Sequence, residues 1–201
     1  MNNTDTVAAE TKGTSSAKRP KRPMLRMILL ALAVLIIGFV IVVAMQPEDY
    51  QVSRSATISA PAAVVFAQVN DFHKWEAWSP WLKKDPAAKG TYEGPSAGTG
   101  AVFGWDGNAE VGSGKMTITD SKLDERLAFR LEFFKPTSGT ADAEFAFQPQ
   151  GNQTNVTWTI SGKKNFISKA FCMFMSMDKM IGGDFEQGLA GIKQIAEAAA
   201  R

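Results

Sequence analysis

The longest hydrophobic stretch of the chain lies near its N-terminus. Nineteen consecutive uncharged residues run from Met27 to Met45. As a helix, with a rise of about 1.5 Å per residue, they would extend about 28 Å, close to the hydrocarbon thickness of a bilayer. This pattern predicts a membrane-spanning helix.

A basic segment precedes the hydrophobic stretch and predicts its orientation. It contains Lys18, Arg19, Lys21, Arg22 and Arg26, and positive charge of this kind is retained on the cytoplasmic side of a membrane. We therefore expect a single-pass protein of the inner (cytoplasmic) membrane, with a cytoplasmic N-terminus and a periplasmic or otherwise extracytoplasmic C-terminal domain. The expected parts are a disordered basic tail over residues 1–23, a transmembrane anchor over 24–45, a short linker over 46–49 and a folded domain over 50–201.

Two other functions could use the same N-terminal pattern. The basic run from Lys18 to Arg22 could be a nuclear-localisation signal, although such motifs are weakly specific. A cleaved signal peptide also begins with basic residues, although its apolar core is usually only about 7–15 residues long. An uncleaved anchor is the interpretation that the length of the apolar stretch favours.

Beyond the apolar stretch, the hydrophobic positions follow the periods of short strands and helices. Residues 50–58 indicate a strand, and Ser59 and Pro61 are expected to begin a helix that Ser59 caps. A second short helix is expected over 72–77, in a region that Pro80 ends. Alternating apolar residues then predict an antiparallel sheet with one apolar face. These residues are Met116 and Ile118; Leu127, Phe129, Leu131 and Phe133; Phe145 and Phe147; and Val156, Trp158 and Ile160.

The period changes near the C-terminus. Ile181, Phe185, Leu189, Ile192 and Ala196 recur at three- and four-residue steps, as in an amphipathic helix. Several glycines lower the intrinsic helix propensity of this segment, so packing against the sheet must stabilise it. The expected fold is α+β: a curved antiparallel sheet wrapped around a long C-terminal helix (helix-grip), preceded by one N-terminal transmembrane helix.

Charge and composition restrict the chemistry of the folded domain. Residues 1–26 carry a net charge of +4 and the rest −2, so the domain lacks the basic field that nucleic-acid binding requires. One cysteine, Cys172, and one histidine, His73, exclude a zinc site built from several thiolates or imidazoles. The sequence indicates no metal and no cofactor. His73 is the weak candidate for acid–base catalysis, because histidine ordinarily titrates near neutrality and Asp71 lies two residues away.

The domain resembles the polyketide cyclase/dehydrase-type bacterial branch of the START-like helix-grip (SRPBCC) superfamily from about Tyr50 to the end. The resemblance rests on Ile58-Ser-Ala-Pro61 with Val65-Phe66, Asn70-Asp71-Phe72, Trp75-Glu-Ala-Trp78-Ser-Pro80-Trp81, Gly112-Ser-Gly114 and the helix Met177-Asp-Lys-Met180 with Asp184-Phe185-Glu186 and Gly188-Leu189. It implies an apolar pocket between sheet and helix for lipids, sterols, polyketides or other hydrophobic molecules. It does not imply catalysis.

The expected ligand-pocket residues are aromatic and aliphatic side chains on the inward faces of these elements. Periodicity alone favours a packed core for them, and the family resemblance reverses this preference. Trp75 and Trp78 could form an aromatic rim at the mouth or pack a short helix against the sheet. The cluster from Phe171 to Met180 could fill gaps at the start of the last helix or, if exposed, form a hydrophobic gate. The expected pocket residues are Trp75, Trp78, Trp81, Phe103, Trp105, Phe129, Leu131, Phe133, Phe145, Phe147, Trp158, Met177, Ile181 and Phe185.

Three functions are compatible with this sequence. The favoured one is a membrane-anchored binding module whose partners are a hydrophobic small molecule or lipid and, through residues 24–45, the membrane. The second is a polyketide cyclase or dehydratase in which His73 or an inward acid is the acid–base group. The third is an envelope protein with a packed core that binds a protein partner.

Overall fold

The structure, a computed structural model, describes residues 22–201. The basic run at 18–22 and the tail expected over 1–23 therefore lie almost wholly outside the described residues. The chain divides into two compact units, the first ending at Val42 and the second comprising Val43–Arg201. Helix α1 (Arg22–Ala44), most of which belongs to the first unit, contains a segment, Pro23–Ala44, with the length and composition of a membrane span, properties that a signal sequence shares.

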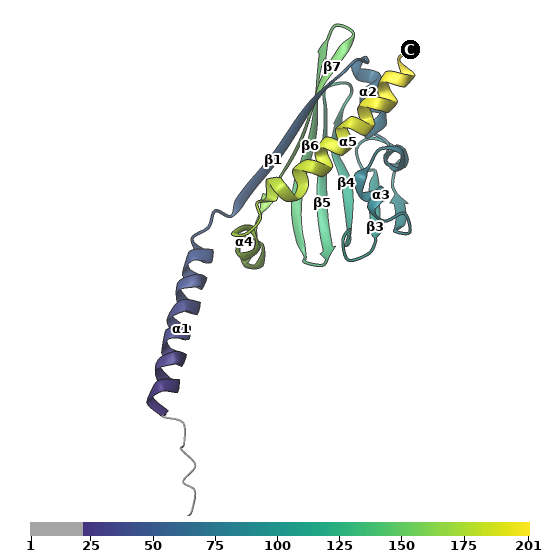
Figure 1. Ribbon diagram of the computed structural model, residues 1–201. Coiled ribbons are helices and arrows are strands. Elements are labelled where there is room, and N and C mark those ends of the chain that lie inside the picture. Colours follow the sequence, from purple (N-terminus) through teal and green to yellow (C-terminus); the bar gives the residue numbers. More distant parts are fainter. Residues whose placement is uncertain (1–21) are drawn as a thin grey trace, which may run out of the picture. The chain divides into compact units, whose positions relative to one another are not determined.

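The second unit is a seven-stranded antiparallel sheet with helices on one face (Figure 1). The strand order is β1-β7-β6-β5-β4-β3-β2. The long helix α5 (Met177–Ala199) lies across the curved face of this sheet, so the predicted helix-grip fold is confirmed. The strands are β1 (Asp49–Ile58), β2 (Lys89–Glu93), β3 (Val102–Asp106), β4 (Ser113–Lys122), β5 (Arg126–Lys135), β6 (Gly139–Gln150) and β7 (Gln153–Lys163). The shorter helices are α2 (Ala62–Val69), the 3₁₀ helix η1 (Phe72–Ala77), α3 (Pro80–Lys84) and α4 (Phe166–Cys172).

The alternation of apolar residues accounts for the register of the central strands. Phe145 on β6 lies opposite Leu127 on β5 and Trp158 on β7, and all three side chains are buried. Their neighbours in sequence face the other side, where Arg130 forms an ion pair with Asp142 at 2.8 Å. One face of the sheet is therefore apolar and covered by helices, as predicted, while the other is polar.

Two expected helix boundaries are wrong. Helix α2 begins after Pro61, and Ser59 does not cap it. Instead, the Ser59 backbone N–H donates to Glu197 Oε1 at 2.8 Å and links the end of β1 to the last turns of α5. Pro80 begins helix α3 rather than ending a helical region, because proline fits a first helical turn, where its missing N–H has no partner to lose.

Two adjacent glycines of α5 have opposite environments and give a matched test of its packing. A Cβ at Gly183 would meet no atom within 4 Å, so Gly183→Ala should raise the free energy of unfolding by about 0.5–1 kcal/mol through helix propensity. A Cβ at Gly182 would clash with the guanidinium of Arg54. Arg54 bonds Asp178 and Glu186 of the same helix, each at 2.7 Å, so Gly182→Ala should lower the free energy of unfolding.

Chemical denaturation followed by circular dichroism measures both changes, and shifts of the same sign would contradict this packing.

The hydrogen bond from Arg54 lowers the pKa of the Asp178 carboxyl. The contribution of this bond to stability is therefore complete above the ordinary carboxyl pKa and is lost as the pH falls through the lowered one.

Candidate ligand cavity

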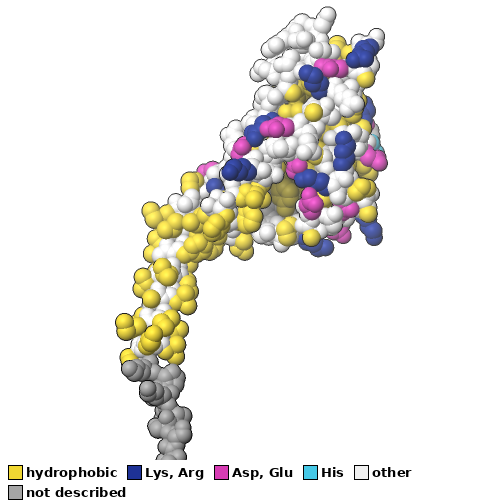
Figure 2. Space-filling view, in the orientation of Figure 1, with side chains coloured by type: hydrophobic (Ala, Val, Ile, Leu, Met, Phe, Trp, Pro, Cys, Tyr) yellow, Lys and Arg dark blue, Asp and Glu magenta, His cyan; other side chains and the backbone are white. Residues whose placement is uncertain are grey.

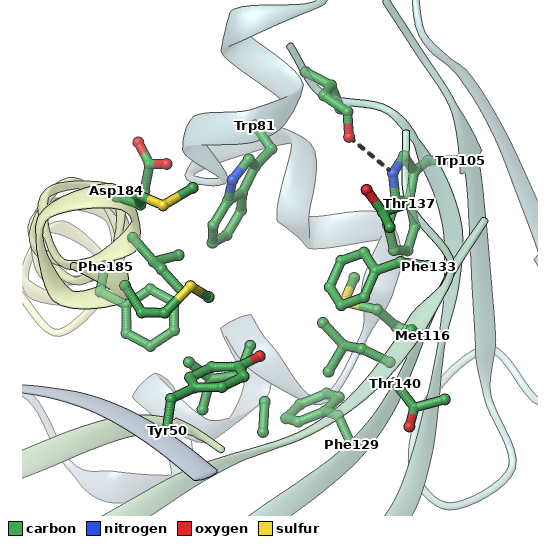
Figure 3. Close-up of a pocket in the computed structure, with 18 of the residues that line it drawn as sticks. Tyr50, Trp81, Trp105, Met116, Phe129, Phe133, Thr137, Thr140, Asp184 and Phe185 are labelled. Carbon is green, nitrogen blue, oxygen red and sulfur yellow. Dashed lines mark hydrogen bonds between the residues drawn. The ribbon is translucent and has the colours of Figure 1, made fainter. Parts of the chain in front are cut away.

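A cavity of about 720 Å³ lies between the curved face of the sheet and helix α5 (Figure 3). Trp105, Phe129 and Phe133 point into it from the sheet, Phe185 faces it from α5, and Trp81 closes one side from α3. The volume is within the range of small-molecule sites, about 300–1,000 Å³, and the walls are mostly apolar, as in such sites. Figure 2 shows a hollow with hydrophobic walls on this face.

The cavity exists because the inward side chains of β6 change in size along the strand. Gly139, Ala141 and Ala143 come first, followed by Phe145 and Phe147 at the same parity. The two phenylalanines fill the space under one end of the helix layer and are buried. The small residues leave the other end open, and Gly139 and Ala143 line the cavity there. This change in side-chain size along β6 is visible in the sequence and indicates which end of the sheet stays open.

The mouth of the cavity lies at the same end of the sheet. Several residues that line the cavity are themselves exposed or half-buried and come from loops. Five such residues define the mouth: Glu110 before β4, Thr137 and Ser138 between β5 and β6, and Lys164 and Asn165 between β7 and α4.

Of the fourteen residues expected to form a pocket, eleven line this cavity. The structure places the other three, Trp78, Phe145 and Phe147, in the buried core and outside the cavity lining. They pack in the filled end, where Phe145 lies 4.5 Å from Trp158 and 6.3 Å from Trp78 between ring centroids. The lining residues are Trp75, Trp81, Phe103, Trp105, Phe129, Leu131, Phe133, Trp158, Met177, Ile181 and Phe185.

Trp75 and Trp78 pack η1 into the core rather than forming a rim. Their indole N–H groups donate to the carbonyls of Val69 and Gln68, at 2.9 and 3.0 Å. These carbonyls belong to the last turn of α2, where helix carbonyls lack intrahelical partners. Both tryptophans thus bury a large apolar surface and also satisfy the end of a helix. Trp75 and Trp81 also line the cavity, whereas Trp78 does not.

The candidate acid–base residue lies outside the cavity lining. His73 is 52 % exposed at its side chain, its Nδ1 lies 2.9 Å from Asp71 Oδ1, to which a protonated Nδ1 donates a hydrogen bond, and its ring stacks on Tyr92 with ring centroids 4.2 Å apart. A smaller depression beside His73 and Tyr92 has a volume of about 190 Å³. His73 therefore has no contact with the space that a bound molecule would occupy.

Sequence reasoning missed the polar group in the cavity wall. Asp184 of α5, only 10 % exposed at its side chain, pairs with Lys84 of α3 at 2.8 Å. Glu110, at the mouth, lies 3.7 Å from the same ammonium group. The signal was the position of Asp184 between Ile181 and Gly188, on the inward face of the helix. The ion pair of Lys84 with Asp184 places two charged groups, each partly neutralised by the other, beside a mostly apolar space.

Tyr50 adds a hydroxyl to the opposite wall, where β1 enters the sheet (Figure 3). Burial raises the pKa of this phenol, so it stays protonated and can donate a hydrogen bond. Within residues 22–201, no group of three or more His, Cys, Asp or Glu side chains is arranged to hold a metal ion.

A curved antiparallel sheet that grips a long helix around an apolar cavity defines a helix-grip ligand-binding domain. The family described as "Polyketide cyclase / dehydrase and lipid transport" matches residues 49–197, and the chain belongs to this family. No curated protein sequence matches the chain significantly.

Solved structures share the fold at low sequence identity. The Zhui aromatase/cyclase from Streptomyces sp. R1128 has a TM-score of 0.58 at 15 % identity, with 77 % of this chain and 97 % of that chain covered. A hypothetical protein of Helicobacter pylori, jhp0584, has a TM-score of 0.57 at 14 % identity, with 77 % and 89 % covered. A protein of Nitrosospira multiformis has a TM-score of 0.54 at 18 % identity, with 76 % and 100 % covered. At these identities the likeness concerns the fold.

Proposed function

We propose that the domain binds a lipid or another hydrophobic small molecule in the cavity between the sheet and α5, and that α1 anchors it at the outer face of the inner membrane. The observation that carries the proposal is the cavity itself, with mostly apolar, aromatic walls and a few polar groups, among them the pair of Lys84 with Asp184 and the Tyr50 hydroxyl. A largely apolar molecule with few polar groups is what such walls would bind.

The cavity argues against the two other functions that the sequence left open. A space of about 720 Å³ does not fit a packed core that only contacts a protein partner. For a cyclase or dehydratase, His73 or an inward acid would have to act on the bound molecule, but His73 lies outside the lining and the inward acid, Asp184, is paired with Lys84. Binding requires neither a packed interior nor a catalytic base, and the family description names lipid transport beside polyketide cyclase / dehydrase.

The test is native mass spectrometry of material purified from cells under mild conditions. A protease site placed between Met45 and Glu48 would release the folded unit after purification, so that lipids around α1 do not contribute. We expect a lipophilic adduct at one molecule per domain, identified after organic extraction. After delipidation, the domain should take up a fluorescent fatty acid.

A domain that carries no adduct and also takes up no fluorescent fatty acid would refute binding in the cavity. The circular dichroism spectrum of the released domain before and after delipidation controls for unfolding.

A further inference from the structure

Helix α4 and the turn after it expose an unusual number of large hydrophobic side chains. Ile167 is 68 % exposed and Phe174 is 83 % exposed. Figure 2 shows hydrophobic side chains gathered over this part of the folded unit. We call this surface the α4 patch; its residues are Phe166, Ile167, Phe171, Met173, Phe174, Met175 and Met180.

The polarity of α4 is inverted relative to a helix on a water-exposed surface. Its buried residue is a lysine, Lys169, whose ammonium group bonds Glu48 at 3.2 Å. Its phenylalanines and isoleucine point outward. A helix in water normally buries its apolar face and exposes its charges, and contiguous exposed apolar surface of this kind marks an interaction site. The patch therefore has the polarity expected of a helix that faces an apolar medium.

The α4 patch adjoins the mouth of the cavity. Asn165 and Ser168, at the start of α4, line the cavity, and so do Met175 and Met180 of the patch itself. Lys163, Lys164 and Lys179 lie among these lining residues. An apolar surface bordered by lysines matches a bilayer, in which an acyl interior lies beneath anionic headgroups.

Covalent connectivity limits how far the patch can be from the end of α1. The Lys164 backbone N–H donates to the Glu48 carbonyl at 2.7 Å, and the Lys169 ammonium group bonds the Glu48 carboxylate. Glu48 is thus fixed to the base of α4, and only three residues, Met45, Gln46 and Pro47, separate it from Ala44, where α1 ends. The four steps along the chain from Ala44 to Glu48 reach about 14 Å at most when fully extended. If α1 spans a bilayer, the base of α4 is held within that distance of the point where the chain leaves the membrane.

We propose that the α4 patch inserts into the outer leaflet of the membrane, so that the mouth of the cavity faces lipid and its ligand enters directly from the bilayer. The proposal rests on the proposed function for the nature of the ligand and for the membrane anchor. The insertion itself can be measured whether or not a ligand binds.

The experiment uses the full chain with a bimane label at one engineered cysteine. In a Cys172→Ala background, the label is placed at Phe174→Cys or at the control Leu123→Cys. Leu123 is also hydrophobic and 73 % exposed, but it lies in the β4–β5 turn at the opposite end of the sheet from α4. Both proteins are reconstituted into vesicles of phosphatidylethanolamine and phosphatidylglycerol, with or without nitroxide-labelled lipid.

We expect nitroxide lipid to remove most of the fluorescence at position 174 and little at position 123, while aqueous iodide does the reverse. Quenching of position 174 by iodide but not by nitroxide lipid would overturn insertion. Protection of position 174 from both quenchers would also overturn it, because a protein partner or a second copy would then cover the patch.

A second pair of variants separates this inference from ligand binding. Ile167→Glu with Phe174→Glu should slow transfer of a fluorescent fatty acid from vesicles into the reconstituted full chain by about tenfold, because two charges would have to enter the bilayer. It should leave equilibrium affinity for the same probe unchanged, and Leu123→Glu should change neither. If the probe binds and transfer is equally fast in all variants, insertion fails while the proposed function stands. If position 174 is quenched by nitroxide lipid and no variant binds the probe, insertion stands while the proposed function fails.

Discussion

A tryptophan in place of Gly139 should reduce binding of a lipophilic probe by more than about tenfold, a loss of at least about 1.4 kcal/mol. A Cβ at Gly139 would meet no atom within 4 Å, and the residue lines the cavity opposite Phe133 on β5. The inward parity of β6 would direct the indole toward the space that the ligand needs. The strand should tolerate the change, because tryptophan has a higher β-propensity than glycine.

Gly183→Trp is the matched control. It makes the same substitution at another glycine whose Cβ would meet no atom within 4 Å, but on the exposed side of α5 and outside the cavity lining. Titration of the delipidated protein with a fluorescent fatty acid measures both variants. Unchanged affinity in Gly139→Trp, with its fold preserved by circular dichroism, would show that the probe binds elsewhere.

Trp78→Ala should lower the free energy of unfolding by about 3–5 kcal/mol, the usual cost of removing a buried aromatic side chain. Trp78 is fully buried, lies 4.5 Å from Trp75 between ring centroids, and its indole N–H satisfies the Gln68 carbonyl. The substitution leaves a void and an unpaired carbonyl in the last turn of α2. Denaturant unfolding followed by circular dichroism measures the change.

Trp81→Ala is the comparison for Trp78→Ala. Trp81 is only half-buried and borders the cavity, so its removal should cost clearly less stability and should weaken ligand binding. Equal losses of stability in the two variants would contradict the division of these tryptophans between the packed core and the cavity wall.

Local pattern was sufficient to predict most elements of the fold. The two-residue period of β5 and β7 and the longer period of α5 reflect which side chains face the apolar layer, and each is visible within one segment. The family motifs gave the same architecture. Strand β2 and helices α3 and α4 were missed, because β2 has no buried residues and the helices are only five and seven residues long.

The candidate site was only partly accessible from the sequence. Phe129 and Phe145 have the same inward parity on neighbouring strands, yet one lines the cavity and the other does not. The difference arises from the side chains that face them on other strands and on α5. Trp158 of β7, for example, stacks on Phe185 of α5 with ring centroids 4.0 Å apart. The pair of Lys84 with Asp184 joins residues one hundred positions apart, and no local pattern relates them.

The amino-acid sequence alone established the apolar N-terminal stretch, the two-faced sheet, the amphipathic last helix and the lack of metal-ligating clusters of histidine and cysteine. These depend on composition and on the order of neighbouring residues. Tertiary structure alone decided where the interior is filled and where it is open, that Trp78 is core while Trp81 is wall, and that α4 turns its apolar side outward. These depend on the distance between elements and on side-chain size at facing positions, quantities that exist only after the strands and α5 have packed together.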